Sequence, residues 1–130
     1  MCIRDSSALL TIVQIETKSA LEQVREIAAV EGVDCLLIGP FDLGNNIGRP
    51  ILTGEMHGEL KEAIERIKEA AHAEGKKVGI YCTSAEDAKS CAERGFDLIS
   101  IANDRVAITD YFSRTLKVAC LLYTSPSPRD

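Results

Sequence analysis

The stretch Cys35-Leu36-Leu37-Ile38-Gly39-Pro40-Phe41-Asp42-Leu43 decides the fold, because it joins a short apolar run to a turn and then to an acid. Four apolar residues closed by Gly39 and Pro40 are typical of a strand in a parallel sheet, which helices cover on its faces. Asp42 follows this strand directly. Functional groups of parallel α/β proteins gather where strands end, so Asp42 is a candidate site residue.

The same order of strand and helix occurs four times along the chain. The predicted strands cover residues 8–15, 35–38, 77–81 and 98–102, and the predicted helices follow at 19–30, 59–73, 84–95 and 106–119. Thr17 and Ser84 are predicted N-caps, and Gly75 is predicted to end a helix. Between the second strand and its helix, residues 39–50 are rich in Gly, Pro and Asn and predict a long loop.

Four β-α units in series predict a parallel sheet with helical crossovers. Two α/β architectures fit this pattern. A doubly wound open sheet could be complete at this length, whereas a (β/α)8 barrel needs about 250 residues and would be present as a half. Periodicity alone leaves both open.

The composition predicts a globular protein without a nucleic-acid or membrane partner. The chain is 45% hydrophobic and 27% charged and has a net charge of −5. An acidic chain without a basic stripe is not typical of nucleic-acid binding, and no apolar run reaches the ~20 residues that span a bilayer. Cys35, Cys82 and Cys91 follow no disulfide or metal-binding spacing and predict buried free thiols, so we expect a cytoplasmic protein.

The two ends are predicted to be remnants of a sequencing adapter. Codons that can encode residues 1–6 have a reverse complement that can encode 120–124, so one DNA element in two orientations explains both ends. We therefore expect adapter-like artefacts at 1–6 and 120–130 and a partial domain over 7–119. The alternative is an ordinary start and a Ser/Pro-rich tail, and the genomic reading frame distinguishes the two.

Glu16 and Asp42 are the strongest candidate site residues. Glu16 follows the first strand on the same side as Gln14, and Asp42 follows the second strand. Consecutive β-α units are usually neighbours, so the two carboxylates can converge on a hard divalent cation such as Mg²⁺ or Mn²⁺. The residues alone leave an equally good alternative, in which Asp42 is a helix N-cap and Glu16 lies in solvent.

Three motifs together resemble the HpcH/HpaI aldolase family. They are Val13-Gln14-Ile15-Glu16-Thr17, the segment 27–34 and Ile38-Gly39-Pro40-Phe41-Asp42-Leu43, and the segments 75–80 and 95–100 resemble the entrances of the family's last two strands. The similarity covers nearly all of 7–119. It implies an α/β fold that is the C-terminal half of a (β/α)8 TIM barrel with four β-α units and parallel strands.

The resemblance implies a metal-dependent, class II type aldolase acting on 4-hydroxy-2-oxo acids. A divalent metal (Mg²⁺, Mn²⁺ or Co²⁺) would stabilise the pyruvate enolate as a Lewis acid. By the resemblance, Glu16 and Asp42 are its ligands, Gln14 lies beside the pyruvyl group, and the backbone amides of Phe41 and Asp42 hold the substrate carboxylate. Tyr81 stands where related sequences often carry an aliphatic pocket residue. The implied partners are pyruvate or another 2-oxo acid, an aldehyde, and further copies of the full-length parent in a homo-oligomer.

The resemblance also implies that the acid–base histidine and an arginine belong to the barrel half that precedes this chain. We therefore expect no catalytic residue in this fragment, surface positions for His57 and His72, and no activity of the fragment alone. No lysine closes a strand, which argues against a Schiff base. Two alternatives remain: a citrate-lyase-like acyl-CoA lyase of the same superfamily, and a non-catalytic α/β binding module.

Overall fold

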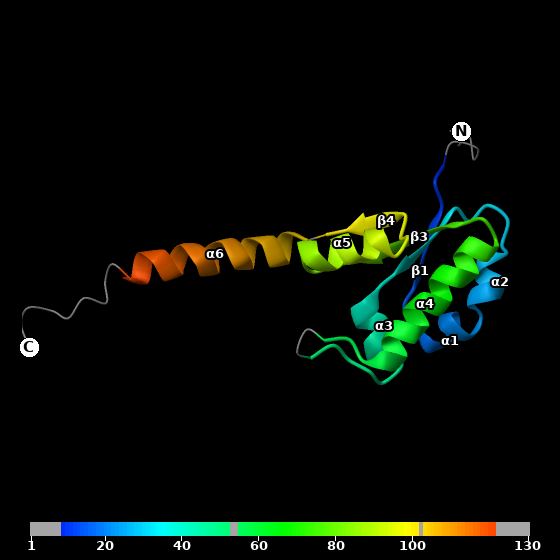
Figure 1. Cartoon of the computed structure of the whole chain (residues 1–130), viewed down its shortest axis with the longest axis horizontal. Helices are drawn as coiled ribbons and strands as arrows, with labels where there is room; N and C mark the ends of the chain where they lie inside the picture. The colour runs from blue at the N-terminus through cyan, green and yellow to red at the C-terminus, as the bar shows by residue number, and fades with distance from the viewer. Residues whose placement is uncertain (1–8, 53–54, 102, 122–130) are drawn as a thin grey trace, which may run out of the picture.

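The computed structural model describes residues 9–52, 55–101 and 103–121, and its centre is a four-stranded sheet (Figure 1). The strands β1 (Ile12–Ile15), β2 (Cys35–Ile38), β3 (Lys77–Tyr81) and β4 (Leu98–Ser100) lie in this order. All three pairings are parallel. The predicted α/β fold with parallel strands is therefore confirmed, since each helical crossover returns the chain to the neighbouring position.

Six helices follow the strands in the described residues. They are α1 (Lys18–Glu22), α2 (Val24–Ala28), α3 (Pro40–Asn46), α4 (Gly58–Ala73), α5 (Ala85–Glu93) and α6 (Asp104–Leu121). The predicted caps are confirmed: the Thr17 hydroxyl accepts from Ala20 N–H, and the Ser84 hydroxyl accepts from Asp87 N–H. Gly75 ends α4 with a φ of 68°, a left-handed conformation that glycine adopts without strain. No described helix combines the length and apolarity that crossing a membrane requires.

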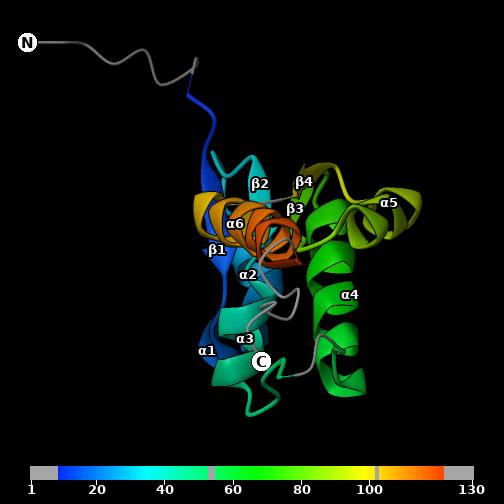
Figure 2. The ribbon, with the colours of Figure 1, turned by 90° about the vertical axis from the view of Figure 1, so that its left-hand side faces the viewer.

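The core lies between the sheet and α4. One face of the sheet presents Leu36, Ile38 and Ile80 to this helix, and all three are buried. The predicted apolar stripe of α4 is buried against them, in agreement with its helical spacing: Leu60, Ile64, Ile67 and Ala71. Figure 2 shows α4 beside α3, with the strands above α3 and α6 in front of them.

The loop predicted over 39–50 is partly wrong, because residues 40–46 form the helix α3. Pro40 occupies the first helical position, where its missing N–H costs nothing, and Asp42 lies in the first turn, where the helix dipole favours a carboxylate. Leu43 is fully buried against the core. Gly44 is also buried, and a Cβ there would lie 2.7 Å from the carbonyl oxygen of Arg49. The turn-forming residues therefore serve a short, tightly packed helix.

Other boundaries differ for similar local reasons. The first strand is shorter than predicted, because its partner β2 has only four residues, and Leu9 and Leu10 remain exposed. The helix predicted over 19–30 is divided at Gln23 into α1 and α2. The last helix begins at Asp104 and runs through Leu121, beyond its predicted end. Of the artefacts predicted at 1–6 and 120–130, residues 1–6 and 122–130 lie outside the described residues, and residues 120 and 121 are the last two of α6.

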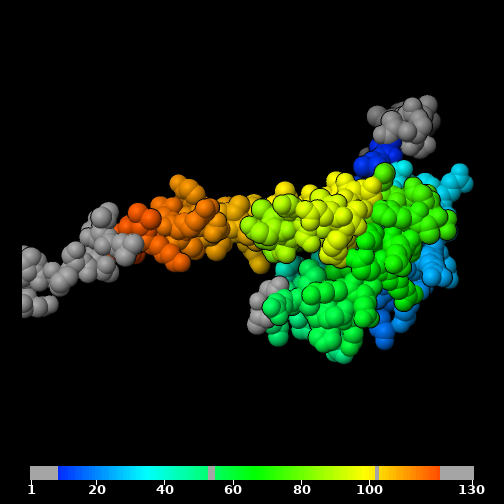
Figure 3. Space-filling view, in the orientation of Figure 1, coloured from blue at the N-terminus to red at the C-terminus, as the bar shows by residue number. Residues whose placement is uncertain are grey.

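The second face of the sheet is not covered by the described helices. Ile12 and Leu98 point to this side and are 40% and 43% exposed. Gln14, Gly39 and Tyr81 occupy the same side nearer the carboxyl ends of the strands. Figure 1 and Figure 3 show α6 extending away from the body, and its apolar residues Ile108, Phe112 and Leu116 are each more than half exposed. The open sheet face is therefore apolar near the amino ends of the strands and polar near their carboxyl ends.

Asp97 links the amino ends of β3 and β4. This end of the sheet is opposite the carboxyl ends of the strands, where Glu16 and Asp42 lie. The Asp97 carboxylate lies 2.8 Å from Lys77 Nζ and 3.0 Å from His72 Nε2, and it accepts the Val78 N–H at 3.1 Å. The hydrogen bond from Lys77, with help from His72 and Val78, lowers the pKa of Asp97 to about 2 from its ordinary value of 3.8.

We expect Asp97→Asn to lower the free energy of unfolding by about 1–2 kcal/mol near neutral pH, a value reduced for solvent screening of this part-exposed group. Because the folded pKa is depressed, this stabilisation is present above 3.8 and disappears as the pH falls toward about 2. Urea unfolding near pH 7 and near pH 3 measures it, with Asp110→Asn as the exposed control. A difference from wild type that is equally large at both pH values would contradict this account.

Candidate active site

The carboxyl ends of β1 and β2 lie side by side, because Ile15 pairs with Ile38 in the parallel register. Glu16 follows Ile15 directly, and Asp42 lies in α3, which follows β2. Both acids line one open hollow of about 370 Å³, together with Thr17, Asn45 and Asn46. The structure therefore brings the two sequence-predicted acids to a common space.

Asp42 is not a helix N-cap. It is the third residue of α3, whose N-cap is Gly39, and no side chain caps this end. The first N–H to bond within this turn is that of Leu43, which donates to the Gly39 carbonyl at 2.9 Å. The N–H groups of Phe41 and Asp42 therefore precede the internal hydrogen bonds of the helix, as at any helix start.

Gln14 orients the carboxylate of Glu16. Its amide Nε2 donates to Glu16 Oε2 at 2.8 Å, and the two side chains share the open side of β1. Gly39, on the neighbouring strand end, leaves the room for this pair. A Cβ at position 39 would lie 2.8 Å from Gln14 Nε2 and 3.6 Å from Glu16 Oε2. Any larger residue at 39 would therefore displace the amide from the carboxylate.

The donors around the hollow fit a hard divalent cation. Every lining side chain carries oxygen: two carboxylates, one hydroxyl and two amides. Mg²⁺ and Mn²⁺ prefer such ligands, and Mg²⁺ commonly keeps several waters beside one or two carboxylates. Within the described ranges, no group of three or more His, Cys, Asp or Glu side chains gathers at one point. The hollow thus offers two acidic ligands and leaves coordination positions for small molecules.

Phe41 and Tyr81 form an aromatic wall of a second cavity, which is distinct from the hollow of Glu16 and Asp42. Their ring centroids are 6.3 Å apart with planes tilted by 59°, and Phe41 is 38% exposed. The hydroxyl of Tyr81 accepts from Asn103 Nδ2 at 3.1 Å, while Asn103 Oδ1 accepts the Val106 N–H at 2.9 Å. Asn103 therefore fixes Tyr81 while capping the start of α6.

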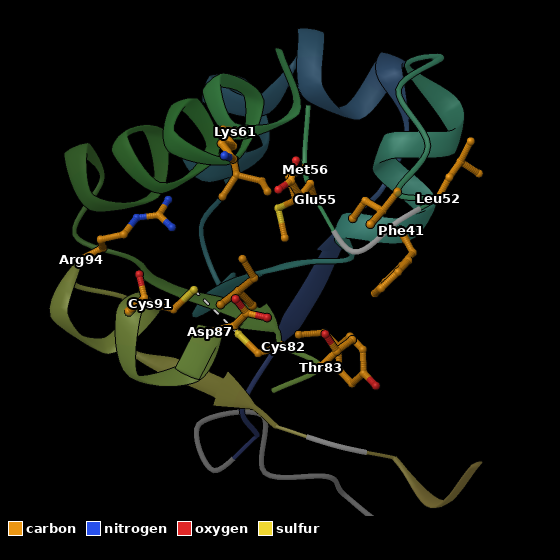
Figure 4. A pocket seen from close by; sticks show the side chains of 15 residues that line it. Phe41, Leu52, Glu55, Met56, Lys61, Cys82, Thr83, Asp87, Cys91 and Arg94 are labelled. Atoms are coloured by element: carbon orange, nitrogen blue, oxygen red, sulfur yellow. Dashed lines mark hydrogen bonds between the residues drawn. The ribbon is translucent and has the colours of Figure 1, made fainter. Parts of the chain in front are cut away.

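The second cavity, of about 720 Å³, begins at this wall and runs between α4 and α5 (Figure 4). Cys82 and Cys91 line it, with their Sγ atoms 3.7 Å apart. Burial, followed by the hydrogen bond with Cys91, raises the pKa of Cys82 to about 12. Cys82 is therefore a protonated, poorly nucleophilic thiol at neutral pH. Cys35, Cys82 and Cys91 are all buried and free, as predicted.

The two histidines have structural roles, and neither of them lines the hollow. His57 is the N-cap of α4 and accepts the Glu59 N–H through Nδ1 at 3.3 Å. His72 is paired with Asp97 at the amino end of the sheet. None of the described lysines lines the hollow.

Two functional positions escaped the sequence analysis. Asn46 lines the hollow one helical turn after Asp42, and Asn103 anchors Tyr81. The four-residue spacing of Asp42 and Asn46 would have been informative had the segment been predicted as a helix. Asn103 carried the ordinary signal of a helix N-cap before the last predicted helix.

The chain belongs to the HpcH/HpaI aldolase/citrate lyase family, whose model matches residues 3–110. A hydroxypyruvate/pyruvate aldolase of Rhizorhabdus wittichii is 38% identical over 99 residues, which are 76% of this chain and 39% of that protein. A 5-keto-4-deoxy-D-glucarate aldolase of Shigella boydii is 37% identical over 93 residues, covering 72% of this chain and 35% of that protein.

The fold agrees with this membership. A crystal structure of an HpcH/HpaI aldolase/citrate lyase family protein from Burkholderia cenocepacia superposes with a TM-score of 0.79 at 30% identity. The superposition covers 87% of this chain and 43% of that structure. The chain thus spans less than half the length of the relatives it matches, and its four β-α units correspond to part of their TIM barrel. The predicted family and fold class are confirmed.

Proposed function

We propose that this chain supplies the metal-binding half of a divalent-metal-dependent aldolase that makes or breaks a carbon–carbon bond in 4-hydroxy-2-oxo acids. The single observation that carries the proposal is the common hollow of Glu16 and Asp42 at adjacent strand ends. Membership of a family that includes 2-oxo-acid aldolases supports the chemistry. The bound cation would act as a Lewis acid toward a developing enolate.

The remaining residues have defined roles in this proposal. Glu16 and Asp42 hold the cation, and Gln14 keeps the Glu16 carboxylate turned toward the hollow through its 2.8 Å hydrogen bond. The N–H groups of Phe41 and Asp42, at the start of α3, are proposed to donate hydrogen bonds to the substrate carboxylate. Tyr81 and Phe41 form one wall of the space proposed for the aldehyde part of the substrate. The acid–base groups of the reaction are proposed to lie on the complementary barrel half, which would cover the open sheet face.

Citrate lyase is the other activity in the family's description, and an acyl-CoA lyase of this type is therefore the second candidate function. The Rhizorhabdus wittichii and Shigella boydii relatives described above are both named as aldolases. The cavity lined by Phe41 and Tyr81 carries two basic residues, Lys61 and Arg94, but also two acids, Glu55 and Asp87, so it has no excess of positive charge to attract the phosphates of CoA. These features favour the aldolase.

Titration of the purified chain with Mn²⁺, followed by electron paramagnetic resonance, tests the proposal. We expect saturable binding of one Mn²⁺ that pyruvate strengthens and acetyl-CoA does not, since pyruvate can occupy the open coordination positions. We also expect no cleavage of a 4-hydroxy-2-oxo acid by the chain alone. Absence of Mn²⁺ binding would contradict the proposed metal site, and strengthening by acetyl-CoA instead of pyruvate would favour the lyase.

A further inference from the structure

Asn46 connects the two acid-bearing segments of the hollow. It is the last residue of α3, and its side-chain Oδ1 accepts the backbone N–H of Lys18 at 2.7 Å. Lys18 is the first residue of α1, whose initial N–H groups have no acceptor within the helix. The Thr17 hydroxyl accepts the Ala20 N–H of the same helical turn. Asn46, which belongs to α3, accepts a second N–H of this turn.

The consequence for Glu16 is that its backbone is fixed on both sides. On the preceding side, Ile15 is held in register with Ile38 of β2. On the following side, two residues along, Lys18 is held by Asn46. Glu16 and Thr17 are therefore the only two residues between these attachments, and both attachments lead to the β2–α3 segment that carries Asp42.

Asp42 and Asn46 lie four residues apart on α3, which places them on the same helix face. Both line the hollow. One short helix thus presents one acid directly and, through Asn46, holds the backbone beside the other acid. A rotation or shift of α3 would move both together, so the spacing between the two carboxylates is preserved.

We propose that Asn46 is a positioning residue for the divalent-cation site, which sets the separation of Glu16 and Asp42 through its hydrogen bond to Lys18 N–H. This inference rests on the proposed function, since it concerns the same cation. Asn46 acts through the backbone and need not touch the cation. Residues that orient metal ligands commonly change metal affinity by about 10–100-fold when they are replaced.

The experiment is Mn²⁺ titration of the full chain carrying Asn46→Ala, with Ser84→Ala as the matched control. The Ser84 hydroxyl also accepts a backbone N–H at the start of a helix, that of Asp87 at 3.0 Å, but Ser84 does not line the hollow. Both variants therefore remove one side-chain acceptor from a helix start, and only Asn46→Ala removes the one beside Glu16. We expect Asn46→Ala to raise the Mn²⁺ dissociation constant about tenfold and Ser84→Ala to change it less than about twofold.

Two further variants separate positioning from general stability. Asn46→Asp keeps an acceptor for Lys18 N–H and is expected to restore Mn²⁺ binding to at least the wild-type level. Asn46→Gln keeps the amide but moves its carbonyl by one methylene, so it is expected to weaken Mn²⁺ binding in a folded protein. Circular dichroism of each variant verifies folding, and the Asn46→Gln result decides if Asn46→Ala does not fold.

The outcomes distinguish this inference from the proposed function. Wild-type Mn²⁺ affinity in folded Asn46→Ala or Asn46→Gln would overturn the role of Asn46 and leave the metal site intact. Equal losses in Ser84→Ala and Asn46→Ala would also overturn it, because the loss of any hydrogen bond at a helix start, and not the link to Lys18, would then explain the weaker binding. Absence of Mn²⁺ binding by the wild type would overturn both proposals.

Discussion

Glu16→Gln and Asp42→Asn are each expected to weaken Mn²⁺ binding by more than about a hundredfold, beyond the loss seen for residues that only orient ligands. Either change removes the charge of one of the two acids in the hollow while keeping the size and shape of its side chain. A divalent cation is then left with one protein carboxylate and loses half of the negative charge that the hollow offers it. Electron paramagnetic resonance of free Mn²⁺ measures the dissociation constant.

The matched control is Glu22→Gln, which removes an equal charge from the same end of the molecule. Glu22 lies on α1 and its nearest cation is Lys18, at 4.0 Å between exposed side chains. Such a pair contributes little, so this variant is expected to bind Mn²⁺ as the wild type does. Equal losses in all three variants would mean that net charge, and not the hollow, governs Mn²⁺ binding.

Leu36→Ala is expected to have the largest effect on stability. Leu36 is completely buried on the central strand β2, where its side chain contributes to the core that α4 covers. Truncation of such a leucine removes apolar burial and leaves a cavity, at a cost of about 2–5 kcal/mol. Because the total stability of a domain is about 5–15 kcal/mol, this change removes a large part of it.

Leu52→Ala makes the same chemical change at a position that is 83% exposed. Its free energy of unfolding is expected to lie within about 0.5 kcal/mol of the wild-type value. Urea unfolding followed by circular dichroism compares the two variants on the same scale. If both lost the same stability, Leu36 would not belong to a packed core and the assigned register of β2 would be wrong.

The sequence was sufficient to predict the sheet and the long helix, because their apolar residues recur at the period of each element. Residues 35–38 and 77–81 were predicted with their observed boundaries, and the stripe from Leu60 to Ala71 is buried. These positions depend on the strongest local signal, the burial of apolar side chains on one side of a regular element.

The helix α3 could not be predicted in this way. Its residues Gly44, Asn45 and Asn46 have low helix propensity, and only the packing of Leu43 and Gly44 beneath α4 explains why the segment is helical. Tertiary contacts therefore outweighed local preference at the place where the candidate site is built. The role of Asn46 was hidden for the same reason, since its partner Lys18 lies 28 residues away.

Glu16 and Asp42 were predicted as a pair from their positions after neighbouring strands, and the structure brings both to one hollow. Their role as metal ligands, and the roles of Gln14, Phe41 and Tyr81 toward substrate, remain proposals.

The exposure of the apolar face of α6 could not be predicted from the sequence either. Periodicity identifies Ile108, Phe112 and Leu116 as one face, but it does not say which surface receives them.

Locating bound Mn²⁺ by nuclear magnetic resonance tests the central claim most directly. Mn²⁺ broadens amide signals close to it, so sub-stoichiometric addition to the labelled chain should first remove the signals of Glu16, Thr17, Asp42, Asn45 and Asn46. The signals of Lys77, Val78 and Asp97, beside an acid at the opposite end of the strands, should persist. Broadening that begins around Asp97, or spreads evenly over the acidic surface, would contradict a cation site shared by Glu16 and Asp42.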